Sequence, residues 1–539
     1  MMLLAWCVTR GFVVCWDYAI VSQKLNKNQI YERIGNMKLP VGTISGEQIN
    51  IIFEKSIQYH IEAYYKTISE YEPKQLYSNW RSIVRSIDEI INIPFELSNC
   101  DEINYFLKLS LNFQKESNLI EIERVKDMLE CRFEENVAIR FIQLAMNCHA
   151  IDGSYKQHGV FNQFGNALDL STTQNSISYF QSRRYYYVTT LNLIPKIAAG
   201  KKTVPYIETL SYLNYTMDSC LVNITTAYYN LLLNHCLPDF EMYSDGVSAN
   251  CNFEYDHLEG FFMEPERLSL IDQIELRPEI VSTPKMLTKA VNKIFSYSEV
   301  ANAMALFEGA FVKYKIKDNI EFKELSSLLY DLSIYLKDDY HIALDEDIFI
   351  TISSKYTSFE LHFNSDDYFE NLNSYSPFQK VDGTYYTTVV LLTRFVYRIL
   401  SQSLLKNKTF QIHSGFVFED KVIKVLGLKG FKSTGITRIN HKEFDIITIK
   451  DNKIFNFQCK NNFIDISRVE YNYKKIGRLN KQLCRYYENA LIKEKNREHF
   501  ITSKLGIRDI EHFVISRYPV ITRNERIINF SYLEDWQPQ

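Results

Sequence analysis

Apolar residues recur every three to four positions along much of the chain between about residues 45 and 335, which is the period of a helix with one buried face. One long example runs from Ile122 to Leu144, and residues 202–236 and 284–338 follow the same period. Residues 237–283 are polar, acidic and contain proline, so we expect a loop or a junction between two subdomains there. The pattern therefore predicts a large, mostly α-helical body.

Three further segments form the C-terminal end of the predicted body. Residues 348–363, IFITISSKYTSFELHF, alternate between apolar and polar positions and are rich in β-branched residues, which predicts a β-hairpin. The polar residues 364–384 separate it from an apolar helix that we predict over 385–405. We place the main domain boundary near residue 400, so that residues 1–400 form the body and residues 401–539 form a second domain.

The second domain begins with a helical pattern over residues 413–431, HSGFVFEDKVIKVLGLKGF. Gly427 and Gly430 mark its predicted end. The next residues, FKSTGITRI, are β-prone. The apolar positions that can form a buried stripe on the helix are Phe416, Val417, Val422, Ile423 and Leu426.

A good two-residue turn, Asp451-Asn452, separates the strand-like stretches KEFDIITIK (442–450) and KIFNFQCK (453–460), so we predict a β-hairpin centred on it. The resulting register pairs Lys450 with Lys453, Ile447 with Asn456, and Asp445 with Gln458.

Side chains alternate between the two faces of a strand, so this register predicts a polar face and an apolar face. The polar face is predicted to carry Asp445, Gln458 and Lys460. The apolar face is predicted to carry Phe444, Ile446, Phe455, Phe457 and Cys459. A lysine directed onto a sheet face beside a carboxylate is costly without a partner or a role, which makes the polar face a candidate site.

Composition adds one fact, the distribution of charge. The balance of 46% apolar and 23% charged residues is ordinary for a globular protein, and the scarcity of Gly and Pro excludes collagen-like and Pro/Gly-rich disordered chains. Residues 401–510 carry 22 Lys and Arg against 11 Asp and Glu, a net charge of +11, which leaves a net charge of −15 on the remainder. A basic segment on an acidic protein is typical of binding to a polyanion, although a solvated basic face gives the same count.

The chemistry-bearing residues resemble those of the PD-(D/E)xK nucleases: an acidic residue on a helix, Asp on one strand, and (D/E/Q)-x-Lys on the paired strand. Here these are Glu419, Asp445 and Gln458-Cys459-Lys460. The helix before them is similar to that of Mrr-like restriction endonucleases and of junction resolvases, and the similarity covers about residues 405–530. It implies an α/β restriction-endonuclease-like domain after the helical body, an α+β multi-domain protein.

The resemblance also implies the roles of these residues in hydrolysing a DNA phosphodiester with Mg²⁺ or Mn²⁺. Asp445 would be the main metal ligand, joined by Gln458, the carbonyl oxygen of Cys459 and Glu419. Lys460 would orient or help to deprotonate the attacking water and stabilise the phosphate. His441 lies nearby in sequence and is more simply explained as incidental. The implied setting is restriction or defence against foreign DNA in a prokaryote.

The segment after the hairpin, RLNKQLCRYYENAL, resembles the helix that follows the catalytic strand, with Lys481 and Gln482 facing the site. Basic and aromatic residues interleave along it, which suits a DNA backbone with some exposed bases. The candidate DNA contacts are Lys474, Lys475, Arg478, Lys481, Gln482 and Arg485. Cleavage of both strands would favour a homodimer, since one site cuts one strand, and the body would bind a trigger or a partner protein.

Two other functions fit the same residues. The first is a nucleic-acid-binding or scaffold protein with a nuclease-derived fold, because Gln458 replaces an acid. The second is a recombination or repair nuclease acting on branched or nicked DNA.

Within the body, Arg183-Arg184 and three following tyrosines could stack on nucleic acid, although the end of an amphipathic helix explains them more simply. His235, Cys236, Cys251 and His257 are zinc-ligand types, but their spacing matches no standard finger.

The ten cysteines include no CxxC pair, which is typical of reduced thiols in a cytoplasmic protein. The apolar N-terminus is interrupted by Arg10 and Asp17, so we expect a buried first element and no membrane span, with peripheral attachment as the alternative.

Overall fold

A computed structural model describes residues 39–92, 101–108, 116–157, 170–246, 249–253, 274, 297–317, 319–462, 464 and 469–538. The predicted N-terminal element, His257, and most of the expected junction at 237–283 lie outside these ranges. None of the described helices is both long enough and apolar enough to cross a membrane.

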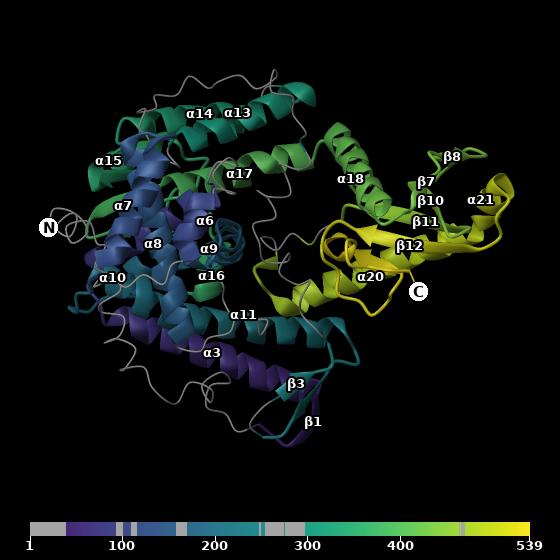
Figure 1. The fold of residues 1–539 in the computed structure, drawn as a ribbon, viewed down its shortest axis with the longest axis horizontal. Coiled ribbons are helices and arrows are strands. Elements are labelled where there is room, and N and C mark those ends of the chain that lie inside the picture. The colour runs from purple at the N-terminus through teal and green to yellow at the C-terminus, as the bar shows by residue number, and fades with distance from the viewer. Residues whose placement is uncertain are drawn as a thin grey trace.

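The body is a stack of helices (Figure 1). Two pairs pack closely within it, α3 with α11 and α4 with α9. α4 illustrates why they form: Pro73 occupies its first position, the Glu72 carboxylate accepts hydrogen bonds from the next backbone N–H groups, and Trp80, Ile83 and Ile87 bury one face. The helices are α3 (Glu47–Ser69), α4 (Pro73–Ile91), α6 (Asp101–Lys108), α7 (Glu116–Glu130), α8 (Glu135–Gln157), α9 (Thr173–Ile197), α10 (Tyr206–Glu208), the π-helix η3 (Thr209–Leu213), α11 (Asn214–Cys236), α13 (Ser298–Lys313), α14 (Ile320–Ser333), α15 (Glu346–Lys355), α16 (Tyr368–Asn373) and α17 (Val389–Leu405).

Arg183 and Arg184 lie in the middle of α9 and are buried, so the suggestion that they stack on nucleic acid is wrong. Arg183 pairs with Asp218, and the Arg184 Nε atom lies 2.9 Å from the Asp88 Oδ1 atom. Buried charges persist only when they are paired, and these pairs tie α9 to α4 and α11. The two arginines are therefore structural.

The predicted hairpin at 348–363 is wrong, because the first half of this stretch, residues 348–355, belongs to helix α15. Phe349 and Ile352 are its buried positions, three residues apart, and Glu346 begins the helix where an acidic side chain favours the dipole. The nearby strands β4 (His341–Asp345), β5 (Gln379–Val381) and β6 (Thr384–Thr388) form their own sheet in the order β4-β6-β5. The helix predicted over 385–405 is confirmed as α17, beginning at Val389.

Around residue 240 a small antiparallel sheet joins β1 (Gly42–Ser45), β2 (Glu241–Ser244) and β3 (Ala249–Cys251). Cys236 is buried among apolar side chains, and the Cys251 Sγ atom donates a hydrogen bond to the Asn230 Oδ1 atom at 3.2 Å. Cys236 and Cys251 therefore have ordinary packing and hydrogen-bond partners.

The C-terminal part is built on a five-stranded sheet with the order β13-β12-β11-β10-β7. β7, β10 and β11 are antiparallel neighbours, whereas β11, β12 and β13 run parallel. Helix α18 packs on one face and α20 on the other, so the sheet is the middle of three layers (Figure 1). The elements are α18 (Lys408–Leu428), β7 (Lys432–Ser433), β8 (Arg438–Ile439), β9 (Lys442–Glu443), β10 (Ile446–Lys450), β11 (Lys453–Lys460), α20 (Tyr473–Asn496), α21 (Glu498–Leu505), β12 (Ile510–Ser516), β13 (Ile527–Asn529) and the 3₁₀ helix η6 (Phe530–Tyr532).

The molecule thus combines a mostly helical body with sheets, which confirms the α+β class. The two parts meet where the first turns of α20 pack against α11. Tyr471, just before α20, is buried there: its hydroxyl shares a hydrogen bond with that of Tyr185, and its carbonyl accepts one from Tyr228. Tyr471 and Ile476 belong to the apolar core of the body rather than to the clusters around the sheet.

Candidate active site

The hairpin that carries the candidate residues has the predicted register. Ile447 pairs with Asn456 and Lys450 with Lys453, and the ladder ends at the pair Ile446 and Phe457. Asp451 and Asn452 both have positive φ, 50° and 61°, which is the backbone of a type I′ turn. The turn residues therefore fix which side chains share a face of β11.

Helix α18 brings Glu419 to this hairpin. Asn407 caps the helix, and its Oδ1 atom accepts a hydrogen bond from the Phe410 N–H at 2.9 Å. The buried face carries Phe418, Val422 and Leu426, which pack with the apolar face of β11 and fix the rotation of the helix. Glu419, next to Phe418, is therefore held half-buried at the edge of this contact.

The stripe predicted on this helix is wrong at Phe416, which is 60% exposed, while Phe418 is buried in its place. Val417, Val422 and Leu426 are buried as predicted, with Ile423 partly buried. The helix also continues past Gly427 to Leu428, and Gly430, with φ of 84°, follows its end.

Asp445 lies at a bend just before β10. Phe444 was predicted on the face that carries Ile446, yet it packs with Ile447 and Ile454 on the other side of the sheet. The bend interrupts the alternation of side chains. The Asp445 carboxylate accepts a hydrogen bond from the Cys459 N–H at 2.8 Å, so it continues the hairpin contact beyond the last ladder pair.

Gln458 and Lys460 share a face of β11, as predicted: the Lys460 Nζ atom donates a hydrogen bond to the Gln458 Oε1 atom at 3.3 Å. Gln458 is buried, and its Nε2 atom has no hydrogen-bond partner within the described part of the chain. The Lys460 Nζ atom also lies 6.0 Å from the centre of the Tyr486 ring on α20. Lys460 thus stands at the carboxyl end of β11 between an amide and an aromatic ring.

Burial and neighbouring charges shift the pKa values of Glu419 and Asp445, and the charge of Lys460 acts on both. Burial, and secondly the charge of Asp445, raise the pKa of Glu419 to about 7, while Lys460 opposes the shift. Burial also raises the pKa of Asp445, and Lys460 and the Cys459 N–H oppose it. A carboxylate disfavours the ionisation of a neighbouring carboxyl group, which is how Asp445 adds to the shift at Glu419. The structure therefore brings three of the predicted site residues together.

The oxygen atoms near Glu419 and Asp445 can be compared with the ligands that the implied metal ion needs. Within the described ranges no three His, Cys, Asp or Glu side chains form a group that could hold an ion. Glu419 and Asp445 supply two carboxylates, and the Gln458 amide and the Cys459 carbonyl are further hard oxygen donors, the type that Mg²⁺ prefers. Burial first, and then the charge of Asp445, raise the pKa of Glu419, and a bound cation would favour its ionised form. The donor chemistry therefore fits a divalent hard cation.

The six candidate DNA contacts are all exposed on α20. The charges of two of them, Lys474 and Lys481, lower the pKa of His235 on α11, after the larger effect of burial. That Lys481 faces the site stays a prediction. Gln482 lies one turn before Tyr486, on the side nearest Lys460.

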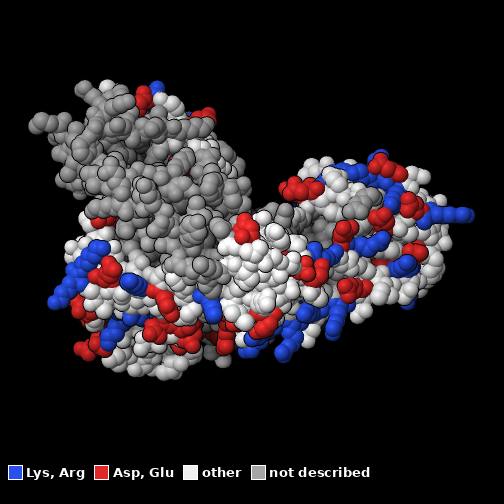
Figure 2. Space-filling model, turned by 90° about the horizontal axis from the view of Figure 1, so that it is seen from below, with Lys and Arg blue, Asp and Glu red and all other residues white. Residues whose placement is uncertain are grey.

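Seen from below, basic side chains gather on the C-terminal part of the molecule and where it meets the body, with acidic side chains among them (Figure 2). His441 lies at the tip of the β8–β9 hairpin, exposed and with φ of 63°, so its position is set by a turn.

Sequence analysis missed Arg517. It follows β12, the parallel neighbour of β11, and its N–H donates a hydrogen bond to the Lys460 carbonyl at 2.9 Å. Its guanidinium lies 5.5 Å from the centre of the ring of Phe418, the residue that precedes Glu419 on α18. The sequence does place this arginine directly after the strand-like run EHFVIS. If that strand runs parallel to β11, the two carboxyl ends lie at the same edge of the sheet, and Arg517 comes near Lys460.

A buried polar network also lies between β11 and the end of helix α20. The Asn456 Nδ2 atom donates a hydrogen bond to the Glu494 Oε2 atom at 2.9 Å, and Glu494 pairs with Arg497. Their charges also influence Asp445, in opposite directions. Strand alternation indicates that Asn456 shares a face with Gln458, but only the fold shows that α20 supplies the partners.

Comparisons with protein-family models, with curated proteins and with solved structures find no match for this chain. Its own residues are therefore the basis for a functional proposal.

Proposed function

We propose that the chain is a metal-dependent DNA endonuclease of the PD-(D/E)xK type, whose site is formed by Glu419, Asp445, Gln458 and Lys460. The observation that carries this proposal is that Asp445 and the hydrogen-bonded pair Gln458 and Lys460 lie on one hairpin, while Glu419 lies on helix α18, which packs against that hairpin. Phosphodiester hydrolysis needs two kinds of group, one to hold a cation and one to stabilise charge on phosphate.

The chain's own residues would divide the work as follows. Lys460 would orient the attacking water and hold its ammonium beside the phosphoryl oxygens, where charge develops. Asp445 is fixed by the hydrogen bond that its Oδ2 atom accepts from the Cys459 N–H. Arg517 is a further cation at the same edge, suited to contact a phosphate.

Mg²⁺ or Mn²⁺ would be held by Asp445, Glu419, the Gln458 amide oxygen and the Cys459 carbonyl. When bound, the ion supplies charge neutralisation and lowers the pKa of water. Gln458 would have to exchange its hydrogen bond with Lys460 for this contact, which frees the ammonium for the substrate.

The partner of the site would be DNA, contacted along α20 by Arg478, Gln482 and Arg485, with Lys474 and Lys475 nearer to the body. The body would recognise a trigger or a partner, in restriction or defence against foreign DNA. Cutting both strands would favour a dimer, because each site hydrolyses one strand.

A second function, binding without cleavage, is favoured by one contact. The Gln458 oxygen, which a metal would need, is already bonded to Lys460, so the polar groups partly satisfy one another. A nuclease-derived binding protein would retain such a contact unchanged when DNA binds.

Cleavage of supercoiled plasmid by the purified protein, with Mg²⁺, Mn²⁺ or EDTA, tests the proposal. We expect nicked or linear product with either metal and none with EDTA. Lys460→Ala and Asp445→Ala should each reduce the rate by about 100-fold or more, as loss of one stabilising group in an active site does.

Lys453→Ala is the matched control, since Lys453 is at the other end of β11 and pairs with Glu511. It should cleave at nearly the wild-type rate. Retarded migration of DNA without any metal-dependent product would contradict the nuclease and support the binding protein instead.

A further inference from the structure

The body contains a polar pocket, remote from the candidate nuclease site, at the end of α9. Its volume is about 570 Å³, within the range of small-molecule sites. The walls come from the last turn of α9, the segment before α16, and the β5–β6 turn. Its chemistry-bearing side chains are Lys196, His362, Ser365, Asp366, Lys380 and Asp382.

Lys196 is the unusual group in this pocket. Its Nζ atom donates a hydrogen bond at 2.8 Å to the amide oxygen of Asn371 and lies 5.3 Å from the centre of the Phe363 ring. Burial lowers its pKa to about 8, and the charge of Asp366 opposes the shift. The ammonium is therefore still largely charged at neutral pH, while none of the ion pairs among the described residues includes it.

The other cation at the pocket is already paired. Lys380 donates to the Glu346 carboxylate at 2.6 Å, and the rim carboxylate of Asp382 lies 3.7 Å from Lys74. Lys196 is thus the lining cation whose hydrogen-bond partner is a neutral group. A half-buried ammonium in that position favours an anionic ligand.

His362 adds an acceptor of fixed orientation. Its Nδ1 atom lies 2.9 Å from the Phe378 carbonyl oxygen, which can only accept, so Nδ1 carries the hydrogen. Burial lowers the pKa of His362, which keeps the ring neutral and leaves Nε2 as an acceptor. With the carboxylate of Asp366, the pocket therefore has acceptors that suit hydroxyl groups on a ligand.

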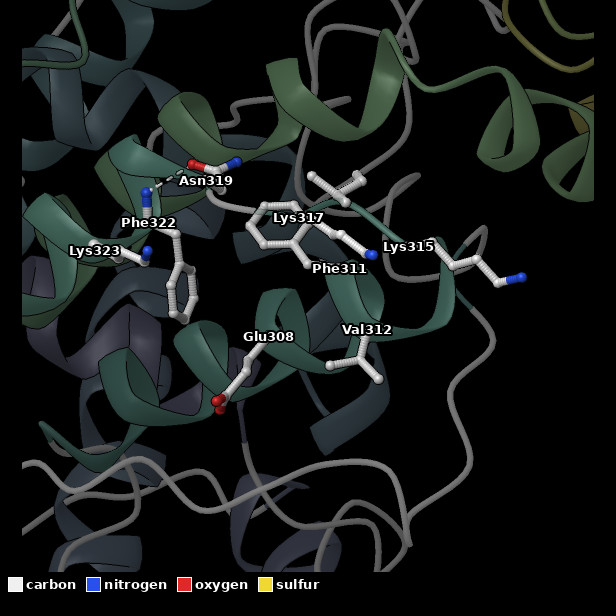
Figure 3. Close-up of a pocket in the computed structure, with 9 residues that line it drawn as sticks. Glu308, Phe311, Val312, Lys315, Lys317, Asn319, Phe322 and Lys323 are labelled. Atoms are coloured by element: carbon white, nitrogen blue, oxygen red, sulfur yellow. Dashed lines mark hydrogen bonds between the residues drawn. The ribbon is translucent and has the colours of Figure 1, made fainter.

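A second hollow, between the end of α13 and the start of α14, lacks this combination (Figure 3). The rings of Phe311 and Phe322 meet there edge to face with centres 5.7 Å apart, and Lys315 extends away from the hollow. It is the more apolar of the two.

We propose that the pocket at Lys196 binds a small hydroxylated molecule that carries one phosphate or carboxylate group. The anion would contact the Lys196 ammonium, and the hydroxyl groups would donate to His362 Nε2 and Asp366. A sugar phosphate or a nucleoside monophosphate has both features and fits the volume. This site does not depend on the proposed nuclease activity.

Titration calorimetry on the full-length protein tests the proposal with five probes: ribose 5-phosphate, adenosine monophosphate, gluconate, inorganic phosphate and ribose. We expect a dissociation constant below 1 mM for at least one hydroxylated anion, and at least tenfold weaker binding of ribose. Lys196→Gln should weaken that binding at least tenfold, whereas Lys201→Gln, an exposed lysine near the same helix end, should not.

Acetylation of lysines in the wild-type protein, mapped by mass spectrometry, gives a measurement that needs no variant. The bound probe should slow modification of Lys196 at least threefold and leave Lys201 unchanged. No binding by any anion, or equal modification of Lys196 with and without the probe, would overturn the proposal. Binding of inorganic phosphate alone would also overturn it, because the hydroxyl contacts would then have no role.

Discussion

Glu419 is held in a position that opposes its own ionisation. Burial and Asp445 raise its pKa from 4.5 to about 7, so the folded protein binds the proton more tightly than the unfolded chain does. The stability that this provides is fully present below about pH 4.5 and is lost as the pH rises through 7. At pH 8 the ionised group should therefore destabilise the fold.

Glu419→Gln should consequently raise the free energy of unfolding at pH 8 in EDTA by roughly 1–2 kcal/mol. One pKa unit corresponds to about 1.4 kcal/mol, and the partial exposure of the group reduces the effect. The gain should shrink to near zero at pH 4.5. Denaturant unfolding at both pH values measures it, and Glu488→Gln, an exposed carboxyl on α20, should show no such gain. An equal effect at both pH values would contradict the electrostatic cause.

At the scale of the element, Gly477 is the point where α20 meets α11. A Cβ atom there would come within 2.9 Å of the His235 Cβ atom and 3.5 Å of its backbone. Alanine usually stabilises a helix relative to glycine, but here the overlap should dominate and cost about 1–3 kcal/mol. We expect Gly477→Ala to lower the thermal midpoint.

Gly427→Ala provides the matched comparison, because a Cβ atom at Gly427 on α18 would meet nothing within 4 Å. It should raise stability by about 0.5–1 kcal/mol through helix propensity alone. Calorimetry of both variants measures the difference. If both substitutions stabilised the protein, the close contact between α20 and α11 would be refuted.

The elements differ in how well the sequence predicts them. The register of the β10–β11 hairpin was predictable from the turn up to the pair Ile446 and Phe457, because a local turn, Asp451-Asn452, fixes it. Helix α15 was not, since its β-branched residues favour a strand locally, whereas the buried positions Phe349 and Ile352 favour a helix only in the folded context.

The same limit applies to the candidate site. Asp445 and Lys460 could be placed on one hairpin from its turn, whereas Glu419 was added to them only by the resemblance to PD-(D/E)xK nucleases. Arg517 comes from a strand 57 residues after Lys460, and the bend that diverts Phe444 depends on packing. Contacts that rest on the topology of the sheet do not follow from local pattern.

At the scale of the whole molecule, the apolar core of the body does not stop at the predicted boundary near residue 400. Ile464, Val469, Tyr471, Ile476 and Ile521 all belong to it. The residues around the sheet form separate clusters. The C-terminal segment is therefore joined to the body by a buried contact as well as by the chain.

This joint predicts how the C-terminal segment behaves when it is separated. A fragment of residues 401–539 would expose Tyr471 and Ile476, and each buried apolar side chain contributes about 1.5–3 kcal/mol. We expect a lower unfolding midpoint than in the full chain, and loss of hydrogen-exchange protection in the first turns of α20. The later turns, where Tyr487 packs on the sheet, should keep their protection and serve as the internal control. Equal unfolding midpoints in fragment and full chain, with full protection at Ile476 in the fragment, would instead mean that the segment is an independent folding unit. The contact with the body would then contribute no stability to it.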